Sequence, residues 1–316
     1  MQSSPKPLLP RKKNLLLCLD AFGTLFAPST PIPIAYARAA ARHGLAVGDT
    51  EHPSAIATSF KQQFKRESQR NPNYGKATGL GAEQWWTNII RGTFTPFLRP
   101  GQSFPPALAT ELLHRYSSRE GYDLFDDVRP LFETLRGGKQ QQRCSNGAVW
   151  PWDRTVVGII TNSDSRVPGI LESFGLRVGH PRFGTTTDEK SAGREGLVND
   201  IDFVVLSYDV GVEKPHANMF RAAEALGETV AGLENSTLDQ QFDKLYVGDE
   251  VEKDYFAARQ AGWGAVLLQR PMSAHAQLET GKGVERVGVK GKDGKTSLVD
   301  AVSSLSELAA WQPNKA

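Results

Sequence analysis

The feature that most constrains the fold is a regular alternation of helical and strand patterns between residues 126 and 269. Helical patterns occupy residues 126–136, 168–176, 216–227 and 252–262, and strand patterns occupy residues 154–164, 201–209, 243–250 and 263–269. Strands separated by helices in this way are typical of a parallel sheet that is covered on both faces. The sequence therefore predicts an α/β fold with a doubly wound, mostly parallel sheet.

A further strand is predicted near the N-terminus, where the unbroken apolar run NLLLCL occupies residues 14–19. A run without alternation is expected of a strand buried on both faces, as in the middle of a parallel sheet. The run ends on the carboxylate of Asp20, and a turn containing glycine follows at once in AFGTLF. We expect this strand to join the same sheet and to present Asp20 at its carboxyl end.

Four helical patterns follow one another between these two regions, with no strand pattern between them. They occupy residues 34–43, 55–69, 82–94 and 106–118. An uninterrupted group of amphipathic segments indicates an all-helical module. We therefore expect one α/β domain, residues 1–29 and 123–316, to be split by a helical insertion at residues 30–122.

Polar side chains stand at the ends of the predicted strands. Asp20, Thr161 and Asp249 each end such a strand. Lys214 precedes a predicted helix, and Asp254 lies on the first turn of the helix that follows Asp249. Because ligands of open α/β sheets bind at the carboxyl ends of the strands, we expect these side chains to converge on one crevice.

The residue types at this crevice indicate a chemistry. Carboxylates brought together repel each other, and a hard cation with oxygen ligands is the usual way to offset that repulsion. Mg²⁺ held by one or two carboxylates leaves coordination positions for a phosphate group. An aspartate beside it can attack phosphorus and form an aspartyl-phosphate, while a hydroxyl and an ammonium neutralise the phosphoryl oxygens.

Four segments occur in an order that resembles the haloacid dehalogenase superfamily: DAFGTL, IITNSD, the Lys214-Pro215 pair and VGDEVEKD. The resemblance spans nearly the whole chain and implies a Rossmann-like core with the insertion as a helical cap. Within the insertion, NPNYG followed by GL and QWW is similar to a eukaryotic branch of the superfamily. The resemblance implies a hydrolase with a Mg²⁺ cofactor and a small-molecule substrate.

The resemblance also implies roles for individual residues. Asp20 would be both the nucleophile and a metal ligand. The backbone carbonyl of Phe22 and the carboxylate of Asp249 would be the other protein ligands, and Asp254 would support them.

On the substrate side, the resemblance implies that Thr161 and Asn162 bind the transferring group. Lys214 would hold both Asp20 and that group, so that Asp20, Thr161 and Lys214 form the catalytic set.

Phe22 departs from the pattern of the superfamily's phosphatases, which carry a second aspartate at this position. That aspartate protonates the leaving oxygen, and losing a positioned acid typically costs about 10²–10⁴-fold in rate. The 2-haloacid dehalogenases of the superfamily carry an aromatic residue here, because halide leaves without a proton, and they work without metal. The segment VGDEVEKD is of the metal-binding kind, and Arg38 and Arg42 are candidates for the halide-binding arginine by location alone.

Three hypotheses therefore stand. The leading one is a Mg²⁺-dependent phosphatase that acts through Asp20 on a small phosphorylated molecule with a good leaving group, such as an acyl phosphate. The alternative enzyme is a 2-haloacid dehalogenase. The third is a catalytically weak or inactive protein of this fold that binds a ligand or a protein partner.

Composition narrows the class of partners. A formal net charge of +2 gives no global attraction to nucleic acid or anionic lipid. No apolar run is long enough for a signal sequence or a membrane span. The two cysteines, Cys18 in an apolar run and Cys144 in a polar loop, make neither a disulfide framework nor a zinc site. We expect a cytoplasmic protein, with KPLLPRKK as a weak nuclear signal, and no motif specifies an oligomeric state.

The remaining segments have plainer interpretations. Residues 137–153, 180–200 and 228–241 are expected to be surface insertions. The stretch GVKGKDGKT lacks the glycine spacing of a phosphate-binding loop, and residues 281–295 are expected to be a lysine-rich surface loop before a terminal helix. Trp85 and Trp86 are assigned to the core of the insertion and its contact with the α/β domain, His216 to a helix start and Glu250 to a peripheral position.

Overall fold

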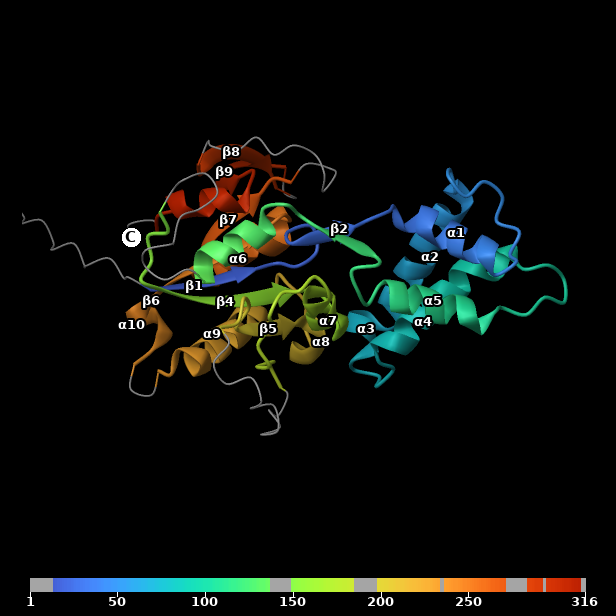
Figure 1. Cartoon of the computed structure of the whole chain (residues 1–316), viewed down its shortest axis with the longest axis horizontal. Helices are drawn as coiled ribbons and strands as arrows, with labels where there is room; N and C mark the ends of the chain where they lie inside the picture. The colour runs from blue at the N-terminus through green and yellow to red at the C-terminus, as the bar shows by residue number, and fades with distance from the viewer. Residues whose placement is uncertain are drawn as a thin grey trace, which may run out of the picture.

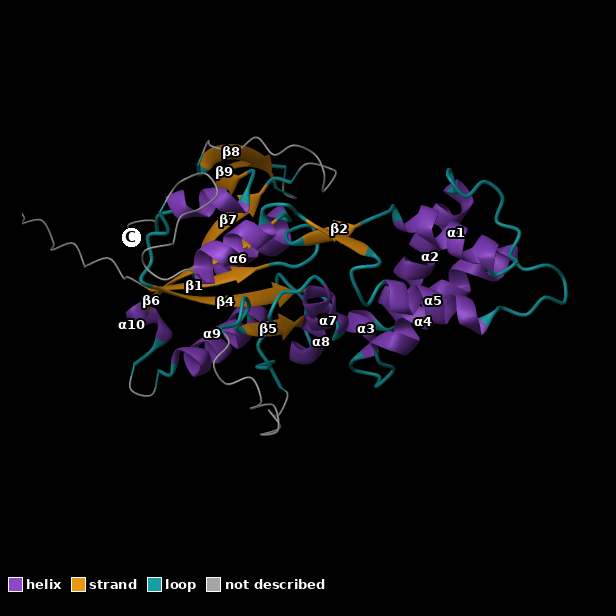
Figure 2. Ribbon diagram, viewed as in Figure 1, coloured by secondary structure: helices purple, strands orange, loops and turns teal. Residues whose placement is uncertain are grey.

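Seven strands form one large sheet with helices on both sides (Figure 1, Figure 2). The computed structural model describes residues 14–136, 149–184, 198–233, 236–270, 283–291 and 294–313. The strands are β1 (Asn14–Leu19), β4 (Arg154–Thr161), β5 (Phe203–Leu206), β6 (Phe242–Gly248), β7 (Gly264–Leu268), β8 (Glu285–Lys290) and β9 (Thr296–Val302). They lie in the order β5-β4-β1-β6-β7-β9-β8; β8 and β9 pair antiparallel, and the other neighbours pair parallel. The predicted α/β class with a mostly parallel sheet is confirmed.

β1 occupies the centre of the sheet because its sequence offers apolar side chains to both faces. It pairs in parallel with β4 and β6, so that Leu16 lies opposite Val156 on one side and Lys244 on the other. Leu17 belongs to the apolar core on one face of the sheet, whereas Leu16 and Cys18 belong to the core on the other. The carboxylate that follows this run therefore emerges at the carboxyl end of the central strand.

Helices cover both faces of the sheet, as the alternation of the sequence predicts. One face packs against α6 (Val128–Arg136), α7 (Arg166–Ser173) and the 3₁₀ helix η4 (Leu305–Ala310). The other packs against α9 (Asn218–Ala231), α10 (Leu238–Gln241) and α11 (Ala257–Gln260). The short helix α8 (Ser207–Val210) follows β5, and a π-helical turn, η3 (Val251–Phe256), leads from β6 into α11.

The helical module, defined here as α1 to α5, stands to one side of the sheet (Figure 1). It consists of α1 (Ile32–Arg42), α2 (Ser54–Arg70), α3 (Pro72–Gly75), α4 (Ala82–Phe94), the 3₁₀ turn η1 (Thr95–Phe97) and α5 (Pro106–Arg115). Two short antiparallel strands, β2 (Phe26–Pro28) and β3 (Tyr122–Leu124), connect it to the rest of the chain. The four helices expected from the sequence are present, and α3 is an addition that the sequence pattern did not predict.

One prediction for the C-terminal region is wrong. Where we expected a lysine-rich loop over 281–295, β8 forms an antiparallel hairpin with β9, with Val287 opposite Val299. Val287 and Val289 alternate with exposed residues, which is an edge-strand pattern that the surrounding lysines and glycines conceal. The expected terminal helix is only the 3₁₀ helix η4, whose residues Leu305 and Leu308 are buried.

The expected surface insertions also need correction where the structure describes them. Trp150 and Trp152, at the end of the first of these segments, are buried, and the ring of Trp152 stacks 6.0 Å from that of Trp311. In the third segment, α9 continues to Ala231 and Leu238 of α10 is buried. Residues 137–148, 185–197 and the N-terminal KPLLPRKK lie outside the described residues, as does Cys144. Across the described chain, no helix has the length and apolar character needed to cross a membrane.

Candidate active site

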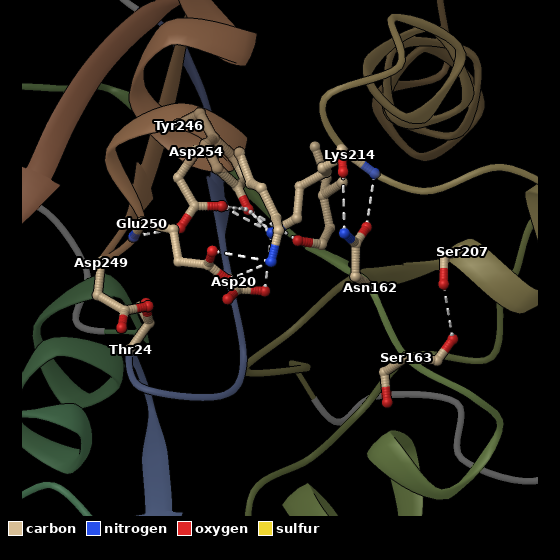
Figure 3. A network of polar contacts seen from close by, with 12 residues as sticks. Asp20, Thr24, Asn162, Ser163, Ser207, Lys214, Tyr246, Asp249, Glu250 and Asp254 are labelled. Atoms are coloured by element: carbon tan, nitrogen blue, oxygen red, sulfur yellow. Dashed lines mark hydrogen bonds and ion pairs between the residues drawn. The ribbon is translucent and has the colours of Figure 1, made fainter. Parts of the chain in front are cut away.

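The predicted polar residues meet at the carboxyl edge of the central strands (Figure 3). Asp20 directly follows β1, Thr161 is the last residue of β4, and Asp249 directly follows β6. Lys214 enters from the loop before α9, and Asp254 enters from η3. β1 has β4 and β6 as its neighbours, so the sheet order itself places the first three residues side by side.

Lys214 is the centre of a buried polar network. Its Nζ lies 3.0 Å from Asp20 Oδ1 and 2.7 Å from Asp254 Oδ1. It also donates a hydrogen bond of 2.7 Å to the hydroxyl of Tyr246, which in turn donates to the carbonyl of Ile160 at 2.8 Å. The ammonium group is therefore fixed between two carboxylates by a tyrosine from the interior of β6.

The charges in this network depend on one another. Burial opposes the charged form of Lys214, but Asp20 and Asp254 outweigh that effect and raise the pKa of the ammonium. Burial raises the pKa of Asp20, and the charge of Asp254 adds to the increase, while Lys214 and the hydroxyl of Thr161 act in the opposite direction. The site stabilises a charged lysine more effectively than it stabilises a charged Asp20.

A third carboxylate completes an acidic cluster. Oxygen atoms of Asp20, Asp249 and Asp254 all lie within 4.8 Å of one another. Asp249 is partly exposed to solvent, but reduced hydration of its carboxyl group and the charges of Asp20 and Asp254 raise its pKa from 3.8 to about 7. The hydroxyl of Thr24 approaches Asp249 Oδ1 at 3.5 Å, which is a long and weak contact. The cluster therefore holds more negative charge than its protein surroundings neutralise.

Gly23 makes room for this cluster. Its φ of +74° lies in the left-handed region, where a side chain is strained. A Cβ at this position would also lie 2.3 Å from Asp249 Oδ2. Glycine is thus required twice over, for the turn after β1 and for the close approach of the Asp249 carboxylate.

The donor set fits a hard divalent cation. Asp20 Oδ1 is buried and makes no aligned hydrogen bond with any described residue, although Lys214 is near it. Asp254 is engaged at both oxygens, with Lys214 on Oδ1 and the backbone N–H of Glu250 on Oδ2 at 2.8 Å. Mg²⁺ prefers carboxylate and water oxygens, so Asp20 and Asp249 suit direct ligation and Asp254 suits a supporting position.

Asn162 makes a positioning contact that the sequence did not predict. Its side-chain oxygen accepts a hydrogen bond of 2.6 Å from the backbone N–H of Lys214, and its Nδ2 donates to the Lys214 carbonyl at 3.0 Å. This paired contact fixes the loop that carries the lysine. Substrate binding by Thr161, which is buried, and by Asn162 stays a prediction, and the structure adds a positioning contact for Asn162.

Phe22 lines the same cavity as Asp20 and packs among other rings. Its ring meets that of Phe26 edge-to-face at 4.8 Å and that of Tyr122 at 5.6 Å. The position two residues after Asp20 therefore belongs to an aromatic cluster and carries no acid. The expected role of the Phe22 carbonyl as a metal ligand stays a prediction.

Arg166 is the cavity's cationic side chain that the sequence analysis missed. Its Nε and Nη2 bind Asp164 at 2.8 and 2.9 Å, and its guanidinium stacks 4.8 Å from the ring centre of Trp86. Trp86 also donates a hydrogen bond to Asp164 at 3.0 Å, which confirms the expected contact between the insertion and the α/β domain. The signal was available, because Arg166 follows the polar turn after β4.

Arg38 and Arg42, the halide-binding candidates, lie elsewhere. Both are exposed and pair with carboxylates of the helical module, Arg38 with Glu51 and Arg42 with Glu111. Neither lines the cavity beside Asp20. The structure therefore gives no support to their assignment by location, since both are paired outside the cavity lining.

The plainer interpretations of Trp85, His216 and Glu250 fit the structure. Trp85 is buried, His216 is exposed and its Nδ1 accepts a hydrogen bond from the Asn218 backbone at the start of α9, and Glu250 is exposed and pairs with Lys253 at 2.8 Å. Tyr246 was missed because it lies inside a strand pattern, where aromatic residues are ordinarily core.

The NPNYG segment joins the helical module to the sheet edge. Asn73 and Tyr74 both adopt positive φ, 47° and 58°, which is uncommon for residues other than glycine. Asn73 Nδ2 donates to the carbonyl of Ser207 at 2.7 Å, and the Tyr74 hydroxyl donates to the carbonyl of Asn162 at 3.1 Å. The strained turn thus directs two side chains onto the segments that border the acidic cluster.

A parallel sheet with an aspartate cluster and a lysine at its carboxyl edge, beside a helical module, is the Rossmann-like architecture that the sequence segments suggested. The haloacid dehalogenase-like hydrolase family model matches residues 16–262, and the chain belongs to this family.

The similarity extends to particular relatives. An uncharacterised hydrolase of Schizosaccharomyces pombe is 29% identical over 263 residues, which cover 80% of this chain and 90% of the relative. Haloacid dehalogenase-like hydrolase domain-containing protein 3 of Danio rerio is 27% identical over 263 residues, covering 82% and 87%. A hydrolase of the family from Bacillus subtilis, solved with bound magnesium, covers 84% of this chain and 92% of its own at 15% identity and a TM-score of 0.45. The expected similarity to the eukaryotic branch is confirmed.

Proposed function

We propose that this chain is a Mg²⁺-dependent phosphohydrolase that takes the phosphoryl group of a small molecule onto Asp20. The observation that carries the proposal is the acidic cluster, in which three carboxylates lie within 4.8 Å of one another and only two of them, those of Asp20 and Asp254, pair with the ammonium of Lys214. Such a cluster is costly unless a cation occupies it.

The metal would be held by Asp20 and Asp249, with the Phe22 carbonyl as a third protein ligand and Asp254 in support. When bound, Mg²⁺ would supply positive charge that keeps the carboxylates ionised and attracts phosphoryl oxygens. The raised pKa of Asp249 supports this assignment, because that carboxyl needs added positive charge to ionise fully at neutral pH.

Asp20, Lys214 and Thr161 then each have a separate role in the reaction. One carboxylate oxygen of Asp20 forms a bond to phosphorus as the bond from phosphorus to the leaving oxygen breaks, and the electron pair departs with that oxygen. Lys214 holds Asp20 in place and, with the Thr161 hydroxyl, faces the phosphoryl oxygens as charge shifts onto them. Water then attacks phosphorus of the aspartyl-phosphate and regenerates the carboxylate.

Phe22 restricts the substrate. With an aromatic ring at this position, no carboxyl group there donates a proton to the leaving oxygen or takes one from the attacking water. Leaving groups that depart as stable anions, such as the carboxylates of acyl phosphates, are therefore favoured over alkoxides.

We also propose that the helical module acts as a cap, with residues 1–29 and 123–316 as the core and residues 30–122 as the cap. The contacts of Asn73, Tyr74 and Trp86 with the sheet edge support this division, because they bring the module over the acidic cluster.

The test is phosphate release from acetyl phosphate and 4-nitrophenyl phosphate, measured with Mg²⁺ and with EDTA. Phosphate released only with Mg²⁺, and lost in Asp20→Asn, is the expected result. Release that continues in EDTA or in Asp20→Asn would contradict the proposal. No release from any phosphate by the folded protein would favour the binding-protein hypothesis.

Phe22 favours one other candidate, a 2-haloacid dehalogenase, because an aromatic residue suits a halide that leaves without a proton. Chloride release from 2-chloropropionate in EDTA, measured in the same preparation, distinguishes the two enzymes.

A further inference from the structure

The cavity beside Asp20 has two unlike walls. It encloses about 440 Å³, within the range of small-molecule sites. The module wall, defined here as the lining residues between positions 32 and 116, contains no charged side chain. Its rings and branched chains include Tyr36, Phe60, Phe64, Trp86, Ile90 and Leu113.

The charged groups of the cavity all belong to the opposite, core wall. Asp20 and Asp249 belong to the acidic cluster described above, and Lys214 pairs with Asp20. The other charged side chains there already have partners, since Arg166 forks onto Asp164 and Lys253 pairs with Glu250. The charged side chains of this wall therefore either face the reacting end of a ligand or pair with other charged side chains of the protein.

Phe64 gives a second indication of what the module wall meets. Its side chain is 39% exposed, unusual for a phenylalanine, and it belongs to the cavity lining. Its ring lies 6.0 Å from those of Phe60 and Trp86, so it extends an aromatic surface rather than standing alone. Exposed apolar surface beside a polar site commonly marks a place for an apolar ligand.

We propose that the substrate carries an aromatic ring in its leaving group, so that the phosphate meets the acidic cluster while the ring packs against the module wall. The inference rests on the proposed function and narrows its substrate to aryl and aromatic acyl phosphates. Both departing groups leave as stabilised anions, which suits the aromatic residue at position 22. Sugar phosphates are less favoured, because the module wall is mostly apolar and the hydroxyls of Tyr36, Tyr74 and Tyr116 offer few partners in return for the water that a sugar would lose.

The test compares benzoyl phosphate with acetyl phosphate. The carboxylic acids that leave from the two substrates are similarly acidic, so their intrinsic reactivities are nearly matched. The substrates differ in the group on the acyl carbon, which is a phenyl ring in benzoyl phosphate and a methyl group in acetyl phosphate. We expect kcat/KM for benzoyl phosphate to be at least about 10-fold higher, the effect of burying a ring of this size. Benzyl phosphate against ethyl phosphate repeats the comparison for esters, because their two leaving alcohols are similarly acidic.

Two variants test whether the module wall causes the preference for benzoyl phosphate over acetyl phosphate. Phe64→Ala should bring the ratio of the two kcat/KM values toward one, because it removes ring surface from the module wall. Leu298→Ala is the matched control, since Leu298 is 68% exposed on β9 and belongs to no part of the cavity, and it should keep the wild-type ratio.

A binding measurement separates this inference from the proposed function. Calorimetry with Mg²⁺ should show that phenylphosphonate, which cannot be hydrolysed, binds about 10-fold or more tightly than methylphosphonate. Equal turnover of benzoyl and acetyl phosphate, or a preference for glucose 6-phosphate, would overturn the aromatic substrate and leave the phosphohydrolase standing. Preferential phenylphosphonate binding without any turnover would keep the aromatic ligand and overturn the hydrolase.

Discussion

At the scale of single residues, the site combines residues that the sequence made visible with others that it concealed. Asp20 and Asp249 were visible because a carboxylate at the end of an apolar run has few structural reasons to be there. Tyr246 was concealed because a tyrosine within a strand is ordinarily core, and only coordinates show that its hydroxyl holds Lys214. The sequence showed that Phe22 departs from the pattern of the family's phosphatases, but it did not show that the ring packs against Phe26.

Restoring the acid tests the part played by Phe22. We expect Phe22→Asp to raise the Mg²⁺-dependent hydrolysis of benzyl phosphate, a substrate with a poor leaving group, by roughly 10-fold or more. Phe22→Asn is the control, because it removes the same ring contacts without supplying a proton. If both variants release phosphate equally fast, the lost acid does not limit the reaction.

Gly23 provides a test of the metal site. Gly23→Ala and Gly44→Ala both place a side chain at positive φ, 74° and 78°, and each should lose about 1–2 kcal/mol of stability. Only the Cβ at position 23 meets Asp249, since nothing lies within 4 Å of the corresponding atom at position 44. Calorimetric Mg²⁺ affinity should therefore fall in Gly23→Ala alone. An unchanged Mg²⁺ affinity in Gly23→Ala would mean that Asp249 does not bind the metal.

At the scale of elements, the hydrophobic pattern of the sequence predicted the fully buried strands correctly. It failed for elements that are only partly buried. β1, β4 and β7 are buried on both faces, and their apolar runs were recognised nearly to the residue. β8 is an edge strand, so only Val287 and Val289 turn inward, and its glycine and lysines imitate a loop. The one-turn helix α3 has no period to detect, and its residues Asn73 and Tyr74 have positive φ.

The strained turn in NPNYG gives a prediction of its own. Asn73→Ala and Asn73→Gly both remove the hydrogen bond to the Ser207 carbonyl, but only glycine adopts a φ of 47° without cost. Urea unfolding should therefore show Asn73→Ala to be less stable than Asn73→Gly by about 1 kcal/mol. An alanine variant as stable as the glycine variant would show that the turn relaxes when the side chain is lost.

At the scale of the whole molecule, the cavity lies between segments that are far apart in the chain. The helical module and the sheet could each be predicted from the sequence. That Phe64 and Asp20 line the same cavity could not be predicted. That relation depends on how α1 to α5 sit against the sheet edge, which is decided by contacts such as Trp86 with Asp164. The class of substrate was for this reason beyond the reach of pattern analysis.

The acidic cluster makes the stability of the whole chain sensitive to pH and to metal. Asp249 has a pKa of about 7 in the folded protein, against 3.8 ordinarily, so the folded state binds the proton more tightly than the unfolded state does. In EDTA, its contribution should therefore destabilise the fold increasingly as pH rises from about 4 to about 7.

Mg²⁺ should reverse that trend, because it binds the ionised carboxyl. The rise in unfolding temperature produced by Mg²⁺ should be larger at about pH 8 than at about pH 6. The corresponding gain in unfolding free energy is about 2.7 kcal/mol at a hundredfold excess over Kd. Asp249→Asn should show little difference between the two pH values. An equal effect of Mg²⁺ at both pH values in the wild-type protein would exclude Asp249 as a ligand that titrates in this range.

The two edges of the sheet bear on how copies of this chain meet. β8 carries the charged residues Glu285, Arg286 and Lys290, which discourage another strand from aligning there. The outer side of β5 is occupied by a neighbouring segment, through the bridge of Arg182 with Val204. Within the described residues, both edges are thus guarded against intermolecular β-pairing and fibril growth. We therefore expect two copies to associate through helical surfaces more readily than through a shared sheet.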